Sequence, residues 1–146
     1  MLDEIQKPRS KEPSEELNLI AEKVVRSAFQ VHVNIGPGLL ERFYRDSLII
    51  ELKKRGLKVE KEVPIPIYYE GVLIEGYYIL DIIVEDKLVI ELKTVEELSK
   101  LHKAQLRTYL RLSGHHLGLL INFNSILIKD GIKRVVNDFY HDETEK

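Results

Sequence analysis

The chain has 146 residues, enough for a single domain with a substantial hydrophobic core. Hydrophobic residues make up 44% and charged residues 32% of it, which is typical of a globular protein, and the absence of cysteine excludes disulfide frameworks, zinc–thiolate sites and cysteine nucleophiles. The formal net charge of −2 argues against a protein that binds nucleic acid through a uniformly positive surface, so such binding requires local basic patches.

The two ends of the chain are polar. Residues 1–12 show no periodicity, which predicts a disordered arm, and the acidic residues 141–146 predict a frayed tail on a single domain over 13–140. The first ten residues lack the apolar segment of a signal peptide, and no apolar run approaches the roughly 20 residues of a membrane span. We therefore expect a cytoplasmic protein without a membrane segment.

Helical periodicity dominates the first third of the domain. Ser14 is expected to cap a helix, because two acids follow it and apolar residues then recur at helical spacing. These apolar residues are Leu17, Ile20, Ala21, Val24, Ala28 and Val31. The segment N-I-G-P-G interrupts the pattern, and a second helix is predicted from Leu39 to about Arg55, with Gly56 after its basic last turn.

From Leu57 the pattern changes to that of β-strands. The segments V-E-K-E-V, I-P-I-Y-Y and V-L-I predict an edge hairpin with prolines on its margin. Tyr77–Val84 and Leu88–Lys93 predict a central hairpin around the turn E-D-K.

The last third predicts a helix between further strands. The helix is expected from about Val95 to Leu112, and strands follow over His116–Asn122 and the segment I-K-R-V-V. This order predicts an α/β (α+β) domain with a mixed central sheet flanked by helices.

The central hairpin contains two acids in apolar surroundings. A turn of three residues, E-D-K, places Asp81 directly opposite Glu91, with Lys93 on the same face of the sheet. On that face we also expect Ile79, Ile83 and Val89, and on the other face Leu80, Ile82, Ile90 and Leu92. Both faces are apolar, which predicts strands that are covered on both sides.

Opposed carboxylates in such a place need compensation. Each ionised carboxylate removed from water costs several kcal/mol unless it is paired. Either Lys93 and a bound divalent cation neutralise the pair, or Lys93 forms a buried salt bridge with one acid while the other reaches the sheet edge or takes up a proton. The spacing alone favours neither alternative.

The acids and their neighbours resemble a known family. Asp81 followed by E-L-K at Glu91–Lys93 resembles the PD-(D/E)XK nuclease superfamily, and G-L-L-E-R-F-Y at Gly38–Tyr44 is similar to the signature of the prokaryotic GxxExxY proteins, a branch of that superfamily. The likeness covers roughly residues 20–136 and continues through the segments E-V-P-I-P-I-Y-Y, V-I-E-L-K, A-Q-L-R-T-Y-L and L-L-I-N-F.

The resemblance implies a restriction-endonuclease-like core and a set of site residues. It makes Asp81, Glu91 and Glu41 ligands of Mg²⁺ or Mn²⁺, Lys93 the catalytic lysine, and Gln105 a polar partner from the following helix, with Gly38, Tyr44 and Tyr109 as supporting motif positions. Two positions depart from the pattern: Ile79 stands where relatives often have a basic residue, and Leu80 stands at the proline position.

The residues themselves leave some of these roles open. Glu41 lies near the positive end of a helix, where a carboxylate also simply stabilises the first turn. Gln105 lies on a stripe that is expected to pack on the sheet, formed by Leu98, Leu101, Gln105, Tyr109 and Leu112. A basic stripe on the same helix is either a nucleic-acid contact or a solvated face, and consists of Lys100, Lys103, Arg107 and Arg111. For the histidines His102, His115 and His116 we expect surface or packing roles.

Charge counting favours a metal. If Glu41 joins Asp81 and Glu91, three acids and Lys93 leave two negative charges uncompensated, the charge of one Mg²⁺. Together with the resemblance, which implies a nuclease, this count predicts a Mg²⁺-dependent enzyme that hydrolyses DNA.

Two alternatives to an active nuclease stay open. One is a non-catalytic or partner-dependent binding module on the same fold. The other is a homodimer that forms through the I-P-I-Y-Y hairpin, near Tyr68, Tyr69, Tyr77 and Tyr78.

Overall fold

The computed structural model describes residues 12–141, so most of the predicted arm and nearly all of the predicted acidic tail lie outside the described residues. No helix in this part of the chain is long and apolar enough to cross a membrane. In chain order the elements are α2 (Glu15–Ile35), α3 (Glu41–Lys54), β1 (Val59–Tyr69), β2 (Val72–Val84), β3 (Leu88–Lys93), α4 (Lys100–Ser113), β4 (Leu117–Asn122), the 3-10 turn η1 (Ile128–Gly131) and β5 (Ile132–Val136).

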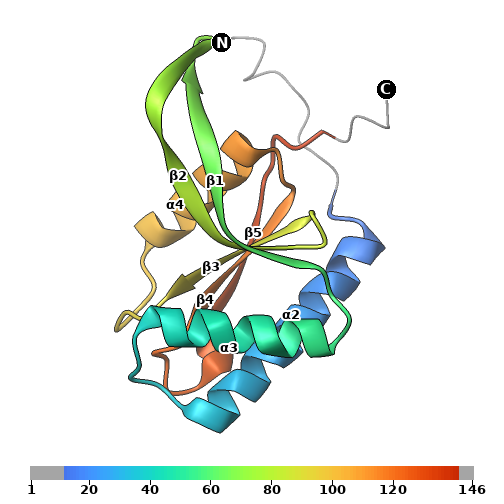
Figure 1. The fold of residues 1–146 in the computed structure, drawn as a ribbon, viewed down its shortest axis with the longest axis vertical. Coiled ribbons are helices and arrows are strands. Elements are labelled where there is room, and N and C mark those ends of the chain that lie inside the picture. Colours follow the sequence, from blue (N-terminus) through green and yellow to red (C-terminus); the bar gives the residue numbers. More distant parts are fainter. Residues whose placement is uncertain (1–11, 142–146) are drawn as a thin grey trace.

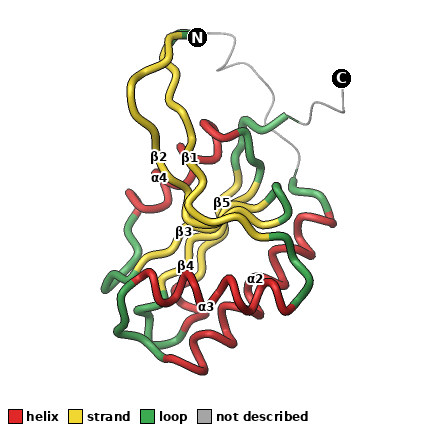
Figure 2. Tube along the Cα trace, viewed as in Figure 1, coloured by secondary structure: helices red, strands yellow, loops and turns green. Residues whose placement is uncertain are grey.

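The five strands form one mixed sheet in the order β1-β2-β3-β4-β5 (Figures 1 and 2). All neighbouring strands are antiparallel except β3 and β4, which are parallel and are connected through α4. This architecture confirms the predicted α/β (α+β) class with a restriction-endonuclease-like core.

Helices cover both faces of the sheet. One core cluster joins the apolar stripe of α2 and α3 to Ile82, Ile90 and Leu92, and a second cluster joins Leu106 and Leu110 of α4 to the opposite face. Every apolar residue of the stripe predicted for α2 is buried, and Ser14 caps the helix by accepting a hydrogen bond from the Leu17 N–H at 3.1 Å. The expectation of strands covered on both sides is confirmed for β3 and for the end of β2 from Leu80 to Val84, but it was wrong for Tyr77, Tyr78 and Ile79, which are exposed.

Helix α4 begins later than the sequence pattern indicated. Ser99 caps it, because the Ser99 Oγ accepts from the His102 N–H at 3.2 Å while His102 Nδ1 accepts from the Ser99 N–H at 3.0 Å. Leu101 and Leu112 are 66% and 39% exposed, so their placement on the packed stripe was wrong. The stripe that is buried instead contains Leu106 and Leu110.

Strands β1 and β2 extend beyond the rest of the sheet. β2 pairs with β3 only over Ile82–Val84, and before this it pairs with β1 alone. Residues 62–80 therefore form a two-stranded arm, here called the β1–β2 ribbon, which projects from the body of the molecule (Figure 1).

The alternation of side chains in β2 breaks where the ribbon leaves the sheet. Leu80 packs in the cluster with α4, whereas Ile82 packs in the cluster with α2 and α3. The expectation that Leu80 shares a face with Ile82 was therefore wrong. The break lies beside an irregularity in β1. Glu62, which stands between the partners of Leu80 and Ile82, has φ 51°, outside the range of a regular strand.

Tyr44 fixes the turn that precedes α3. Its hydroxyl donates to the Gly36 carbonyl at 2.6 Å and accepts from the Leu39 N–H at 3.0 Å, and its ring stacks on Phe123 with centroids 4.7 Å apart. Gly38, with φ 109°, takes a backbone conformation that other residues rarely adopt. These contacts define where α3 begins, and Glu41 is its first residue.

We predict that Tyr44→Phe destabilises the protein by about 1–3 kcal/mol, because it leaves the Gly36 carbonyl and the Leu39 N–H without their partner. The ring contact with Phe123 is retained, so the loss reports on the hydroxyl. Urea denaturation measures the effect, and Tyr68→Phe, at a residue 58% exposed on the ribbon, is the matched control. Equal stabilities of the two variants would contradict the assigned role.

Candidate functional site

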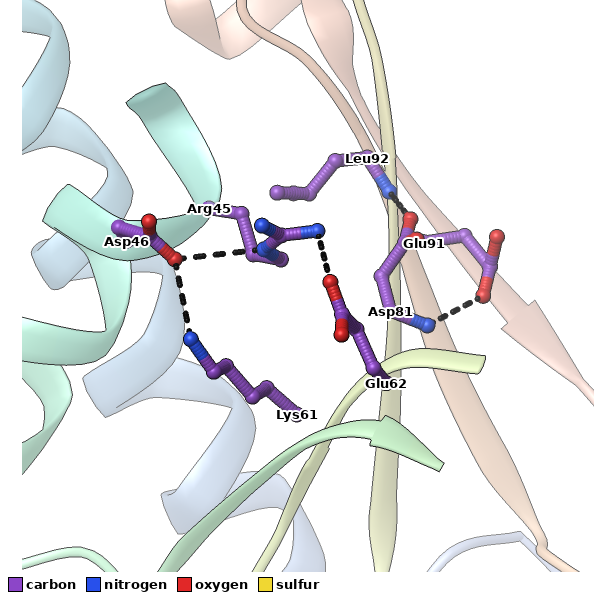
Figure 3. Close-up of polar contacts among 7 residues, drawn as sticks. All are labelled: Arg45, Asp46, Lys61, Glu62, Asp81, Glu91 and Leu92. Atoms are coloured by element: carbon purple, nitrogen blue, oxygen red, sulfur yellow. Dashed lines mark hydrogen bonds and ion pairs between the residues drawn. The ribbon is translucent and has the colours of Figure 1, made fainter. Parts of the chain in front are cut away.

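The two acids of the central hairpin lie where β2 and β3 separate. The register is the predicted one, since Ile82 stands opposite Ile90 and Val84 opposite Leu88. At the next pair along the strands, Asp81 and Glu91, hydrogen bonds from backbone to side chain take the place of bonds between the two backbones. The Asp81 N–H donates to Glu91 Oε1 at 3.1 Å, and the Leu92 N–H donates to Asp81 Oδ2 at 2.8 Å (Figure 3). Each carboxylate is thus held by the backbone of the other strand.

Burial disfavours the ionised forms of these two acids. Glu91 is only 6% exposed, and burial followed by the charge of Asp81 raises the pKa of Glu91 to about 8, against the opposing effects of the Asp81 N–H and Lys93. Burial also raises the pKa of Asp81, although the Leu92 N–H and the Lys93 ammonium favour its ionised form. With a pKa of about 8, Glu91 is mostly protonated at neutral pH in the metal-free protein, so the hairpin's own groups do not compensate two ionised carboxylates.

Glu41 brings a third carboxyl to the pair from α3. It is half-buried, and its pKa is raised by burial and then by the charge of Asp81, while Lys93 and Arg45 act in the opposite direction. The structure thus brings Glu41, Asp81, Glu91 and Lys93 into one neighbourhood. Their roles as metal ligands and catalytic lysine stay predictions.

The acids are not a preformed metal cage. Among residues 12–141, no three His, Cys, Asp or Glu side chains form a group that could hold a metal ion as they stand. The backbone contacts of Asp81 Oδ2 and Glu91 Oε1 turn these oxygens toward the strands. An ion at this place requires rearrangement of the carboxylates, Glu41 among them.

The three histidines have structural contacts, as expected. His102 forms part of the α4 cap, the His115 Nδ1 lies 2.8 Å from the Ser113 Oγ, and the buried His116 stacks on Tyr140 with centroids 4.3 Å apart.

Helix α4 approaches the acids through Tyr109. The pKa of Tyr109 is raised by burial and then by the charges of Glu91, Tyr78 and Asp81, and its ring lies 5.4 Å from that of Tyr78. Gln105 lies one turn earlier on α4 and is half-buried. No hydrogen bond joins Gln105 to the acids within residues 12–141, so its role as a polar partner stays a prediction.

The predicted basic stripe of α4 is largely solvated. Lys100, Arg107 and Arg111 are exposed and Lys103 is half-buried. The Arg111 guanidinium lies 4.5 Å from the centroid of the Phe139 ring, which fixes one end of the stripe on the protein surface. The stripe is free to contact a polyanion but is not joined to the acids.

Arg45 is a site residue that the sequence analysis missed. Its Nη1 lies 2.8 Å from Glu62 Oε1 and its Nε 3.3 Å from Asp46 Oδ1, and its side chain is only 20% exposed (Figure 3). Its charge favours the ionised forms of Glu41 and Asp81, whose pKa values it lowers. Its position four residues after Glu41, on the same helix face, was the available signal.

We predict that Glu91→Gln stabilises the metal-free protein by on the order of 3 kcal/mol at about pH 9 and by much less at about pH 5. The folded-state pKa of Glu91, about 8, lies above the unfolded value, so the wild-type protein loses stability as pH rises from about 4.5 to about 8. The Gln carbonyl still accepts from the Asp81 N–H. Denaturation in EDTA at the two pH values measures the difference, and an equal effect at both would contradict the buried charge.

The comparison with family models agrees with the fold. A family model described as the PD-(D/E)XK nuclease superfamily matches residues 18–135. No curated protein matches. Among solved structures, SSO0001 is similar at 26% sequence identity and a TM-score of 0.48; the match covers 71% of this chain and 52% of the other, so the chain spans about half the length of SSO0001. Because the family model spans most of the described domain, the chain belongs to the PD-(D/E)XK nuclease superfamily.

Proposed function

We propose that the protein is a Mg²⁺- or Mn²⁺-dependent nuclease of the GxxExxY branch that hydrolyses DNA in the prokaryotic cytoplasm. One observation carries the proposal: three carboxyls and one lysine gather where β2 and β3 separate, and the pKa of each carboxyl is raised. Membership in a nuclease superfamily supports the same function.

The donor set fits a hard divalent cation. Carboxylate oxygens completed by water and phosphate suit Mg²⁺ and Mn²⁺. Asp81, Glu91 and Glu41 would hold the ion, whose charge would offset the burial and the charge of Asp81 that together raise the pKa of Glu91 to about 8. Because the carboxylates are not a ready-made group within residues 12–141, we expect binding to reorient them.

The chain's own groups supply position and charge. A bound divalent ion would activate the attacking water and withdraw charge from the phosphoryl oxygen. Lys93, at the end of β3, is half-buried beside the acids, where its ammonium can donate hydrogen bonds to a phosphate oxygen and stabilise developing negative charge. Arg45 forms an ion pair with Glu62, and its guanidinium is a second positive charge near Glu41 and Asp81.

The basic stripe of α4 supports a polyanionic substrate. Lys100, Arg107 and Arg111 are exposed on α4. On the same helix, the charges of Glu91 and Asp81 contribute to the raised pKa of Tyr109, after burial. Helical spacing puts these cations on the face of α4 opposite to Tyr109, so a nucleic-acid backbone bound to them would have to pass around the helix to reach the acids.

A second candidate function is a binding module that does not cut by itself. The overall charge of −2 and the lack of a ready-made metal group within residues 12–141 favour this alternative. Such a protein would depend on a partner to complete the site or would only bind nucleic acid.

We predict that Mg²⁺ or Mn²⁺ raises the melting temperature and that Asp81→Ala or Glu91→Ala abolishes the rise. At a metal concentration about 100 times Kd the stabilisation is about 2.7 kcal/mol, which corresponds to a shift of several degrees. Differential scanning fluorimetry measures it, with Glu15→Gln, at an exposed acid in the first turn of α2, as the control. A wild-type protein that does not respond to either ion would refute the metal site.

We predict that the protein with Mn²⁺ cleaves at least one member of a panel of single-stranded and double-stranded DNA and RNA, with DNA preferred. Glu91→Ala and Lys93→Ala are each expected to lower the rate at least about 100-fold, because they remove metal affinity and charge stabilisation respectively. Gel electrophoresis of end-labelled substrates measures the cleavage. Cleavage that persists in Lys93→Ala would point to another active site, and metal binding without any cleavage would favour the binding module.

A further inference from the structure

The β1–β2 ribbon exposes more apolar surface than an isolated hairpin can sustain in water. Every residue from Val72 to Ile79 is exposed. The apolar side chains of this strand segment are between 47% and 67% exposed, and they are Val72, Leu73, Ile74, Tyr77, Tyr78 and Ile79. A two-stranded hairpin alone is only marginally stable, so a ribbon of this composition requires a cover.

The exposed area matches that of a protein interface. The six side chains are distributed over both faces of the ribbon, because neighbours in a strand point to opposite sides, and Tyr78 lies beside Tyr109 of α4. At up to roughly 200 Å² each and about half exposed, they present about 600 Å² over the two faces together. Tyr68 and Tyr69, exposed by 58% and 67% on β1, extend the surface. The apolar area of the whole ribbon, both faces counted, approaches the roughly 800 Å² that each partner contributes to a standard interface.

The charge of the ribbon excludes nucleic acid as its cover. Between residues 62 and 86 the chain contains no lysine, arginine or histidine. The acids of the ribbon are Glu62, Glu70 and Glu75, and Asp81 follows directly. Such a surface repels both a phosphate backbone and an anionic membrane, so it fits a protein.

The ribbon is built for contact through its face, not through its edges. Pro64 and Pro66 deprive β1 of backbone donors. The register shift between Pro66 and Ile67 leaves Glu75 and Gly76 of β2 bulged, with φ 104° at Gly76, which disturbs the other edge. One face has a groove of about 740 Å³ whose lining includes Pro64, Pro66, Leu73, Tyr77 and Ile79.

We propose that the ribbon of a second copy of this chain occupies the groove, so that the protein is a two-fold symmetric homodimer. The groove and the protruding aromatic tip, with Tyr68 and Tyr69, belong to the same ribbon, so an antiparallel arrangement lets each tip fill the partner's groove. The arrangement brings Glu70 at the tip toward Lys61 at the partner's base, and of the two acids that line the groove, Glu62 and Glu75, the first is already paired with Arg45. Lys61 is 55% exposed and has only a 3.8 Å contact with Asp46.

This inference does not depend on the proposed nuclease function. The ribbon variants below leave Glu41, Asp81, Glu91 and Lys93 unchanged, so the melting-temperature response to Mg²⁺ in the same samples tests the metal site separately.

Sedimentation of the full chain over a range of concentrations tests the proposal. At about 100 μM we expect a mass of twice the 17.0 kDa of one chain, since interfaces of this size have micromolar or tighter affinity. Tyr77→Lys, in the groove, is expected to weaken dimerisation at least about 30-fold. Leu73→Lys is the second groove variant should the first fail to fold by circular dichroism, and Val33→Lys, at a residue 77% exposed on α2, is the matched control.

A charge exchange tests the arrangement of the two copies. Glu70→Lys is expected to weaken dimerisation about fivefold, and combining it with Lys61→Glu is expected to restore it. The proposal is overturned if the wild-type chain stays monomeric. It is also overturned if the Tyr77→Lys or Leu73→Lys variant folds and dimerises with the same affinity as the wild type. The tip-to-base arrangement is overturned if Glu70→Lys leaves the dimerisation affinity unchanged, or if adding Lys61→Glu to Glu70→Lys does not restore that affinity.

Discussion

The reciprocal hydrogen bonds between the Asp81 and Glu91 side chains and the backbone of the opposite strand govern the rest of the structure. At this point β2 leaves β3, and the N–H groups of Asp81 and Leu92 lose the strand-to-strand partners that every buried donor needs. The two carboxylates satisfy them. The same two residues therefore complete the backbone hydrogen bonds where the sheet divides and bring two carboxyls into its interior. The fold and the candidate site therefore have one origin.

The division of the sheet has an electrostatic cost that the surrounding elements reduce only in part. Lys93 and the backbone N–H groups favour the ionised acids, and Arg45 adds a second cation from α3. Glu41 from the same helix increases the repulsion again. A protein selected for stability alone would place amides or apolar residues at these positions. Retention of three carboxyls with raised pKa values is typical of a site that needs their charge for binding or chemistry.

The features that the sequence predicted are those set by local periodicity. The apolar stripe of α2 and the register of Asp81 opposite Glu91 follow from helical spacing and from the three-residue turn, and the structure has both. The side of Leu80 was mispredicted because strict alternation assumes a regular pair of strands, whereas Glu62 of β1, beside this point, has φ 51°. The start of α4 was missed because the Ser99 cap competes with a longer apolar pattern. Arg45 was missed because its partner Glu62 lies on another element, and pairing across elements leaves little trace in one sequence.

Strand β2 connects the two surfaces that this fold leaves incomplete. Its first part is the exposed half of the β1–β2 ribbon, and its next residues are Leu80, packed against the α4 cluster, and Asp81. Tyr78 contacts Tyr109, whose pKa responds to the charges of Glu91 and Asp81. The path from ribbon to acids is therefore only a few residues of one continuous strand. The exposed ribbon and the half-buried Asp81 are thus successive parts of one strand, and Leu80, packed against α4, separates the apolar surface from the acids.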